Sequence, residues 1–283
     1  MDSPVPADTP TIEIAQAPGT LAGLAAVLKA SRKRPGRIES LPPVCYLRPA
    51  VKLDAANIAT YAKVCGYRPE HGVPLLYPQM LTFPLAMAYF ASQYCPWPAM
   101  GTVHLANRVQ QHAPLHVGDA LRVEMRPGLL LAHEKGQVFT LEFQIWRDQT
   151  LVWKATQTLL RLGVPNPSGP PYTSALHNAA PLSVQTSFKA DSHIGRRYGR
   201  VSGDLNPIHL SALSAKLFGF RRAIAHGMWT QARALAAVLP RKPLTQADVQ
   251  VEFKTPLFLP ALATVWSTRA AQGPLPYLSL IHI

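Results

Sequence analysis

"YPQMLTFPLAMAYFASQY", residues 77–94, decides the fold when it is set beside "HGMWTQARALAAVLP", residues 226–240. Both stretches are apolar enough to form a buried helix, and both contain a Met-x-Thr triplet near their start. Segments rich in Val, Leu, Phe, Trp and Thr follow each helix and are predicted to be strands, at 121–132, 136–146 and 150–162 in the first case and at 247–260 and 263–270 in the second. A helix followed by antiparallel strands, occurring twice, predicts a duplicated α+β unit in which one long helix is wrapped by a curved antiparallel sheet.

The segments around the two repeats set the predicted domain boundaries. Residues 166–181 are rich in Pro, Ser, Gly and Asn and are predicted to be a linker. Residues 1–40 combine a Pro/Ala tail, the apolar stretch 21–28 and the basic cluster "KASRKRPGR". We expect a loosely held extension, with the apolar stretch docking as a helix and the basic residues solvated. The predicted order is an extension (1–40), a first repeat (41–165), the linker (166–181) and a second repeat (182–283).

Composition limits the classes to which this protein can belong. Of the 283 residues, 48% are hydrophobic, which is enough for a packed core. Lys and Arg number 28 against 15 Asp and Glu, so the surface is expected to attract phosphates, nucleic acid or an acidic protein. No zinc module, RNP-like aromatic motif or helix-turn-helix pattern supports binding to nucleic acid.

Three features of the sequence predict a cytoplasmic protein that does not enter the membrane. The three cysteines are odd in number and lie outside any CxxC pair, which argues against a disulfide framework. The acidic, Pro-rich N-terminus lacks the basic-then-apolar order of a secretory signal. No apolar run approaches the roughly 18 to 20 residues that would cross a bilayer.

A comparison of the repeats locates the candidate site. The stretch "IATYAKVCGY" (58–67) aligns with "IGRRYGRVSGD" (194–204) once one residue is inserted, so that Tyr67 falls on Asp204. From the aligned glycine to the aligned methionine the first repeat has 14 positions and the second has 25. The longer segment contains His209, five positions after Asp204, and the first repeat has no counterpart to either residue. We therefore expect the first repeat to be chemically inert.

The stretch "YGRVSGDLNPIHLSALSAKLFGFRRAIAHGM", residues 198–228, resembles the signature of the MaoC-like dehydratases, the (R)-specific enoyl-CoA hydratases also called hydratase 2. The positions that agree are Tyr198, Ser-Gly-Asp at 202–204, Asn-Pro at 206–207, His209, Ala215, Gly-Phe at 219–220 and His-Gly-Met at 226–228. The resemblance is sharp over about 194–260 and diffuse over 45–163, where the strand pattern and the repeat support it. It implies a double hotdog fold whose second half is catalytic and whose first half has lost the catalytic segment.

The resemblance also implies an acyl-thioester hydratase/dehydratase, which interconverts a trans-2-enoyl-CoA or enoyl-carrier-protein and the (R)-3-hydroxyacyl thioester. Asp204 and His209 would bind and activate water together, and the sequence leaves open which of them is the formal base. Gly227 would present its backbone N–H to the thioester oxygen at the start of its helix. CoA or the pantetheine of a carrier protein is part of the substrate, so we expect no metal and no further cofactor.

Four more residues of this segment are expected to bind the substrate or to support the site. Ser202 is expected to steady the histidine or the loop, and Asn206 to hold the turn through side-chain bonds to the backbone. His226 fits a packed residue at a helix start as well as a functional one. Arg222, like the other arginines around the motif, fits either a solvated basic face or a contact with CoA phosphates or with an acidic acyl carrier protein.

Two other functions compete with this prediction. A hotdog thioesterase is weakened by the spacing of Asp204, His209 and the "HGM" triplet, which resembles the hydratase arrangement. A non-catalytic acyl-thioester-binding subunit would have no evident need for Asp204 and His209 in one repeat and not in the other.

The end of the chain is short relative to the first repeat. After Met228 there are 55 residues, against 83 from Met80 to Gly163, so we expect the last strand of the second hotdog to be short or missing. A chain with two hotdogs already supplies the pairing that single hotdogs obtain by dimerising, and a monomer and a homodimer both stay open.

Overall fold

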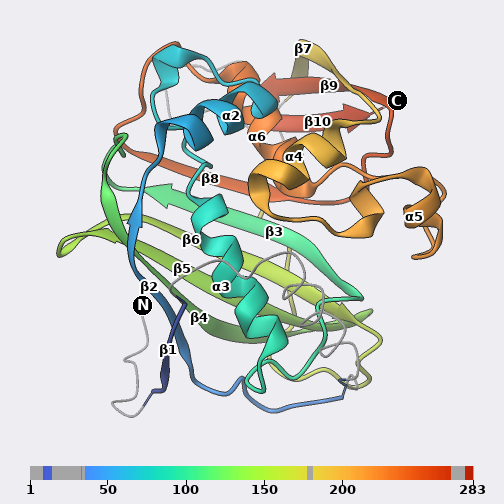
Figure 1. Ribbon diagram of the computed structural model, residues 1–283. Coiled ribbons are helices and arrows are strands. Elements are labelled where there is room, and N and C mark those ends of the chain that lie inside the picture. The colour runs from blue at the N-terminus through green and yellow to red at the C-terminus, as the bar shows by residue number, and fades with distance from the viewer. Residues whose placement is uncertain (1–8, 15–32, 34–35, 177–180, 269–277, 283) are drawn as a thin grey trace. The chain divides into compact units, whose positions relative to one another are not determined.

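The structure, a computed structural model, contains two compact units, each built from segments that are distant in the sequence (Figure 1). Unit 1 contains Met1–Leu53, Pro78–Ser174 and Thr245–Glu252, and unit 2 contains Asp54–Tyr77, Ala175–Leu244 and Phe253–Ile283. Within these spans the residues that the structure describes are 9–14, 33, 36–176, 181–268 and 278–282. The helix expected at 21–28 lies outside the described residues.

A seven-stranded sheet forms most of unit 1, in the order β1-β2-β4-β5-β6-β3-β8. Its strands are β1 (Thr11–Glu13), β2 (Cys45–Lys52), β3 (Thr102–Gln111), β4 (Ala120–His133), β5 (Gly136–Arg147), β6 (Thr150–Leu162) and β8 (Ala247–Glu252). β1 pairs with β2 in parallel, and each other neighbouring pair is antiparallel. The three strands predicted after the first helix are confirmed as β4, β5 and β6, whose β-branched and aromatic residues suit a pleated, half-buried surface.

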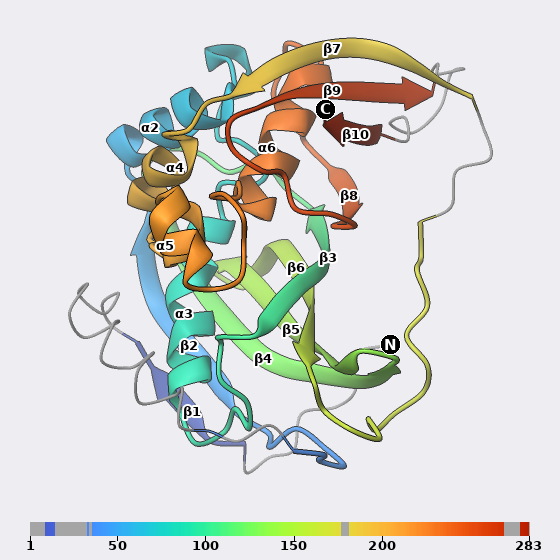
Figure 2. The same cartoon turned by 90° about the vertical axis from the view of Figure 1, so that its right-hand side faces the viewer.

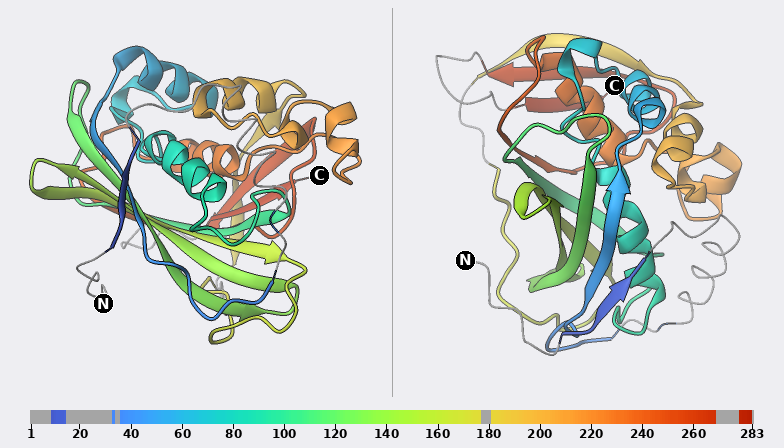
Figure 3. Two further views of the ribbon diagram at one scale, coloured as in Figure 1. Left: turned by 60° about the horizontal axis from the view of Figure 1, so that its bottom comes forward. Right: turned by 60° about the vertical axis from the view of Figure 1, so that its left-hand side comes forward.

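The helix α3 (Gln79–Ala91) lies along the sheet of unit 1, as Figure 3 shows, and confirms the helix predicted for the first repeat. Tyr89 meets Tyr46 of β2 edge-on, with ring centroids 6.1 Å apart. Phe90 meets Phe139 of β5 edge-on at 6.3 Å. Such pairs add about 0.5–1.5 kcal/mol to the free energy gained by burying the rings. The unit is therefore a helix packed on an antiparallel sheet, as the sequence predicts.

Lys33 of the N-terminal basic cluster is bound to unit 1, so the expectation of a loose, solvated segment is wrong for this residue. The Lys33 ammonium donates to the backbone oxygens of Phe90, Ser92 and Cys95 at 2.8, 2.5 and 2.7 Å, beyond the C-terminus of α3. Cations are favoured there because the last carbonyls of a helix carry partial negative charge and have no partner within the helix. One lysine of the basic cluster therefore caps the buried helix.

We expect Lys33→Met to destabilise unit 1 by about 2 kcal/mol, because the variant keeps the aliphatic stem and loses three charge-assisted hydrogen bonds. Urea unfolding followed by tryptophan fluorescence measures the effect. The control is Lys135→Met, whose side chain is 67% exposed and whose loss should change the unfolding free energy little. Equal midpoints for the two variants would show that the Lys33 bonds do not stabilise the fold.

Unit 2 contains a three-stranded antiparallel sheet, in the order β10-β9-β7, and the helix α6 (Gly227–Val238), shown in Figure 2. The strands are β7 (Leu182–Ala190), β9 (Ala261–Thr268) and β10 (Leu278–His282), and the other helices are α2 (Ala55–Cys65), α4 (Ile194–Ser202), α5 (Ala212–Lys216) and the 3-10 helices η1 (Pro69–His71) and η2 (Pro207–His209). Trp229 of α6 packs edge-on against Phe188 of β7, with ring centroids 5.8 Å apart. β10 is the last strand in the described part of the chain and is five residues long.

Two exchanged segments distinguish these units from the predicted boundaries. α2 belongs to unit 2, because Tyr61 packs against Tyr198 of α4 with ring centroids 6.3 Å apart and the Trp229 indole donates to the Val64 oxygen at 3.0 Å. β8 belongs to unit 1, because it pairs antiparallel with β3. A repeat found in the sequence does not reveal such an exchange, since it orders segments along the chain and not by their contacts.

The cysteines and the helix lengths bear on the predictions made from composition. Cys45, Cys65 and Cys95 are buried free thiols. Burial raises the pKa of Cys65 to about 12 and that of Cys95 to about 11, so both stay protonated near neutral pH.

None of the helices in the described part of the chain is both long and apolar enough to span a membrane.

Candidate active site

The turn after α4 places the Asp204 carboxylate. The helix ends at Ser202 and is followed by Gly203, which has the left-handed conformation that glycine favours (φ 80°). The Asp204 N–H donates to Ser202 Oγ at 3.2 Å, and the Asn206 N–H donates to Asp204 Oδ1 at 3.1 Å. These bonds hold the main chain on both sides of Asp204 and orient its side chain, which is 32% exposed.

The short helix η2 places His209. Asn206 Oδ1 accepts from the Ile208 N–H at 3.3 Å, and Pro207 occupies the first position of the turn. His209 is buried, and its Nδ1 lies 2.8 Å from the Ile224 carbonyl oxygen. Because a carbonyl oxygen can only accept, the neutral ring carries its proton on Nδ1 and keeps a lone pair on Nε2.

Two glycines of α4 allow the segment that carries Asp204 and His209 to pass close to the helix. A Cβ on Gly195 would lie 1.9 Å from the His209 carbonyl oxygen, and one on Gly199 would lie 2.7 Å from the Asp204 carbonyl oxygen. Reasoning from the sequence missed both residues. The available signal was their spacing of four, which puts them on one face of the helix that precedes the motif.

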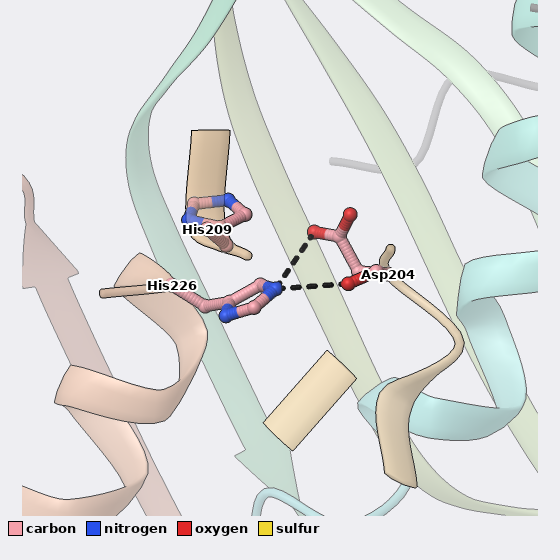
Figure 4. Close-up of side chains that lie close together, drawn as sticks. All are labelled: Asp204, His209 and His226. Atoms are coloured by element: carbon pink, nitrogen blue, oxygen red, sulfur yellow. Dashed lines mark hydrogen bonds and ion pairs between the residues drawn. The ribbon is translucent and has the colours of Figure 1, made fainter. Parts of the chain in front are cut away.

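His226 joins Asp204 and His209 at the N-terminus of α6, as Figure 4 shows. Its Nε2 lies 3.0 Å from the Asp204 carbonyl oxygen and 3.7 Å from Asp204 Oδ2. Its ring stacks on that of His209, with centroids 3.7 Å apart and planes 26° from parallel. The structure therefore brings His226, whose role the sequence left open, into contact with both candidate catalytic residues.

Burial controls the protonation of both histidines. It lowers the pKa of His209, against the Asp204 carboxylate and the bond to the Ile224 oxygen, which both raise it. Burial also lowers the pKa of His226 to about 4, helped by the neighbouring His209 and opposed by Asp204. Both rings are therefore neutral near pH 7, and two adjacent imidazoles offer lone pairs rather than positive charge.

Gly227 is the first residue of α6. A Cβ there would lie 3.1–3.3 Å from the Phe253 ring, so packing within unit 2 favours glycine at this position. His226, the residue before it, makes no side-chain capping bond to the described helix. The first N–H groups of α6 and the positive end of its dipole therefore stand beside the Asp204, His209 and His226 side chains.

The same three side chains are the candidate metal ligands in the described residues, with ligand atoms within 4.8 Å of one another. In Figure 4 the His226 nitrogen that faces Asp204 is the one that donates to its carbonyl oxygen. His209 Nδ1 is likewise used on the Ile224 carbonyl. The two stacked rings hold their remaining lone pairs in nearly parallel planes, whereas a tetrahedral metal ion needs convergent nitrogens at about 2.0–2.1 Å.

The arginines beside the motif are not part of this group. The Arg222 guanidinium stands 5.8 Å from the centre of the Phe258 ring, and that of Arg221 stands 4.5 Å from it. Arg197 pairs instead with Asp191. Arg221 and Arg222 thus form an exposed basic pair supported by one aromatic ring, and Arg197 is paired within its own segment.

The start of α3 shows what unit 1 has at the place of Gly227. The repeat alignment puts Gln79 there, and this residue is buried. Its amide nitrogen lies 3.4 Å from Asn107 Oδ1, and its oxygen accepts from Gln157 Nε2 at 3.0 Å. A hydrogen-bonded side chain therefore occupies the helix start in unit 1, where unit 2 has a glycine.

Three comparisons relate the chain to known proteins. The family described as "MaoC like domain" matches residues 178–261. The 3-hydroxyacyl-thioester dehydratase X of Mycobacterium tuberculosis is 35% identical over 240 residues, which cover 84% of this chain and 84% of that protein.

Solved structures extend the likeness to the fold. The crystal structure of HtdX of Mycobacterium tuberculosis matches with a TM-score of 0.67 at 31% identity, over 84% of this chain and 98% of that one. A conserved hypothetical protein of the same organism, described as having a double hotdog fold, matches with a TM-score of 0.54 at 14% identity, over 83% and 87% of the two chains. The second likeness bears on the fold alone. The predicted α+β double hotdog fold is confirmed.

Proposed function

This chain belongs to the MaoC-like dehydratase family, and from that membership we propose that it interconverts a 3-hydroxyacyl thioester and the trans-2-enoyl thioester, with the (R) configuration at C3. The observation that carries the proposal is the meeting of Asp204, His209 and His226 at the N-terminus of α6. The relative whose name states dehydration of 3-hydroxyacyl thioesters supports the reaction class.

Hydration of an enoyl thioester forms a C–O bond at C3 and a C–H bond at C2. As the water oxygen attacks C3, the π-electron pair moves through C2 onto the thioester oxygen. In the proposal, His209 Nε2 accepts the proton that leaves the water, and the Asp204 carboxylate binds the water and stabilises the resulting imidazolium. A proton from this pair then reaches C2 as the enolate collapses, which returns both residues to their starting state. Dehydration uses the same groups in reverse order.

The negative charge that develops on the thioester oxygen needs a donor. In the proposal the Gly227 N–H supplies it, because the N-terminus of α6 combines free N–H groups with the positive end of the helix dipole. A donor of this kind contributes on the order of 3 kcal/mol to transition-state stabilisation. Ser202 and Asn206 act indirectly, through their bonds to the main chain around Asp204 and Ile208.

The thioester carrier is CoA or an acyl carrier protein. Both are anionic, and the exposed pair Arg221 and Arg222 is the substrate-facing surface that we propose for either. The reaction involves no net oxidation or reduction and therefore needs no redox cofactor. The proposal assigns proton transfer and stabilisation of the thioester oxygen to the protein groups named above, with no metal and no cofactor beyond the carrier. A cytoplasmic location stays a prediction, and a monomer and a homodimer both stay open.

Loss of enoyl absorbance tests the proposed function. We expect turnover of crotonyl-CoA, a longer enoyl-CoA or the carrier-bound substrates, an (R)-3-hydroxyacyl product on a chiral column, and no change in rate after incubation with EDTA. Release of free thiol without loss of the C2–C3 double bond would indicate a thioesterase. Tight binding of the thioesters without any turnover would indicate a non-catalytic subunit, and inactivation by EDTA would contradict the metal-free mechanism.

A further inference from the structure

His226 occupies a helix start that does not require a histidine. It precedes α6, and within the described chain it makes no side-chain capping bond. At the corresponding position before α3 the chain has Pro78, and α3 forms with that residue in place. Helix formation therefore does not explain why position 226 is a histidine.

The contacts of His226 are with the candidate catalytic residues. Its Nε2 lies 3.0 Å from the Asp204 carbonyl oxygen, and because that oxygen can only accept, the ring proton is on Nε2. Its Nδ1 is buried and has no hydrogen-bond partner among the described residues, so it holds the lone pair. One face of the ring stacks on His209. These contacts fix both the tautomer and the plane of His226.

The groups that surround His226 also fix its charge. They are Asp204 from the turn, His209 from η2 and Tyr198 from α4, whose ring centre lies 5.0 Å away. Burial raises the pKa of Tyr198, which keeps that group uncharged. A second proton on His226 would sit on a buried nitrogen without an acceptor and beside another imidazole, which agrees with its lowered pKa. His226 is therefore an uncharged donor at neutral pH.

We propose that His226 is a positioning residue with two separable tasks: its Nε2–H holds the main chain of Asp204, and its uncharged ring covers one face of the His209 imidazole. The first task fixes the carboxylate relative to the base. The second keeps water away from His209, so that this ring stays unprotonated at neutral pH. The kinetic consequences rest on the proposed function, whereas the protonation states of the two rings do not.

Three variants separate the two tasks. His226→Gln keeps an N–H donor near the position of Nε2 and loses the ring, His226→Phe keeps a ring and loses the donor, and His226→Ala loses both. At the optimum pH we expect kcat/KM to stay within about threefold of wild type in His226→Gln and to fall by about 10- to 100-fold in His226→Phe, with the loss in kcat.

The pH profile reports the second task. Water that enters beside His209 weakens the desolvation that lowers its pKa, so the acid limb of kcat/KM should move to higher pH in His226→Gln and His226→Ala. It should keep its position in His226→Phe. A loss of stability alone would scale the profile and would not move its limb. A wild-type kcat/KM in His226→Phe, or an unmoved acid limb in His226→Ala, overturns the proposal.

NMR of the unaltered protein labelled with 15N-histidine tests the proposal without any activity. At pH 7 we expect His226 to carry its proton on Nε2 and His209 on Nδ1, with signals assigned by their loss in His226→Gln and His209→Gln. A protonated His226, or one with its proton on Nδ1, overturns the proposal even in an active enzyme. The expected tautomers in a protein that hydrates no enoyl thioester would support the contacts of His226 and contradict the proposed function.

Discussion

Replacement of Asp204 by Asn, or of His209 by Gln, is expected to lower kcat/KM for enoyl-thioester hydration by about 10²- to 10⁴-fold each. Asn at position 204 keeps an oxygen for the Asn206 N–H but removes the negative charge that stabilises a protonated His209. Gln at position 209 has no basic nitrogen to take the proton from water. KM should change little, because neither side chain is proposed to hold the acyl chain or the carrier.

Steady-state kinetics with the carrier that the wild type prefers measure these effects. The matched controls are Asp191→Asn and His193→Gln, exposed residues just before α4, which should keep activity within about twofold. The kcat/KM of the double variant Asp204→Asn/His209→Gln should be only slightly lower than that of the less active single variant, because residues that act as a unit give non-additive losses. Full activity in either single variant would refute the assignment of the site, and losses that multiply in the double variant would refute the paired mechanism.

Local pattern was enough to predict one helix of this site, α6, and the main elements of unit 1. The period of the apolar residues and the turn residues predicted α3, α6 and strands β4 to β6, and the chain around Asp204 and His209 stood out because it occurs in one repeat and not in the other. Short-range chemistry of this kind depends on neighbours in the sequence. The resemblance to a known family added the roles of the residues, which spacing does not provide.

Long-range contacts account for what the sequence did not predict. Lys33 caps a helix that ends nearly sixty positions later, and β8 joins the sheet of unit 1 through β3. The sequence left the role of His226 open because that role depends on its contact with the His209 ring, 17 positions earlier in the chain. None of these contacts has a signature in the residues that surround it, so only the folded chain shows them.

Gly195→Ala is expected to destabilise unit 2 by about 2 to 4 kcal/mol. The fraction of the variant that still folds is expected to have lost most of its activity. The new Cβ would lie 1.9 Å from the carbonyl oxygen of His209 and 2.9 Å from its carbonyl carbon, and both atoms are backbone that cannot turn aside. Either α4 or η2 must move. A displacement of about 1 Å at a catalytic base costs on the order of 10²-fold in rate.

The sign of the stability change separates this prediction from ordinary helix propensity. Ala is favoured over Gly inside a helix by about 0.8–1.0 kcal/mol. If Gly195 made no close contact outside its helix, Gly195→Ala would therefore be more stable than the wild type. Gly199→Ala, with its Cβ 2.7 Å from the Asp204 oxygen, should show a smaller loss, and Gly36→Ala, where no described atom lies within 4 Å of a new Cβ, should show none. Urea unfolding and kcat/KM on the three variants give the order. If Gly195→Ala is as stable as wild type, the close passage of the His209 segment over α4 does not hold the site together.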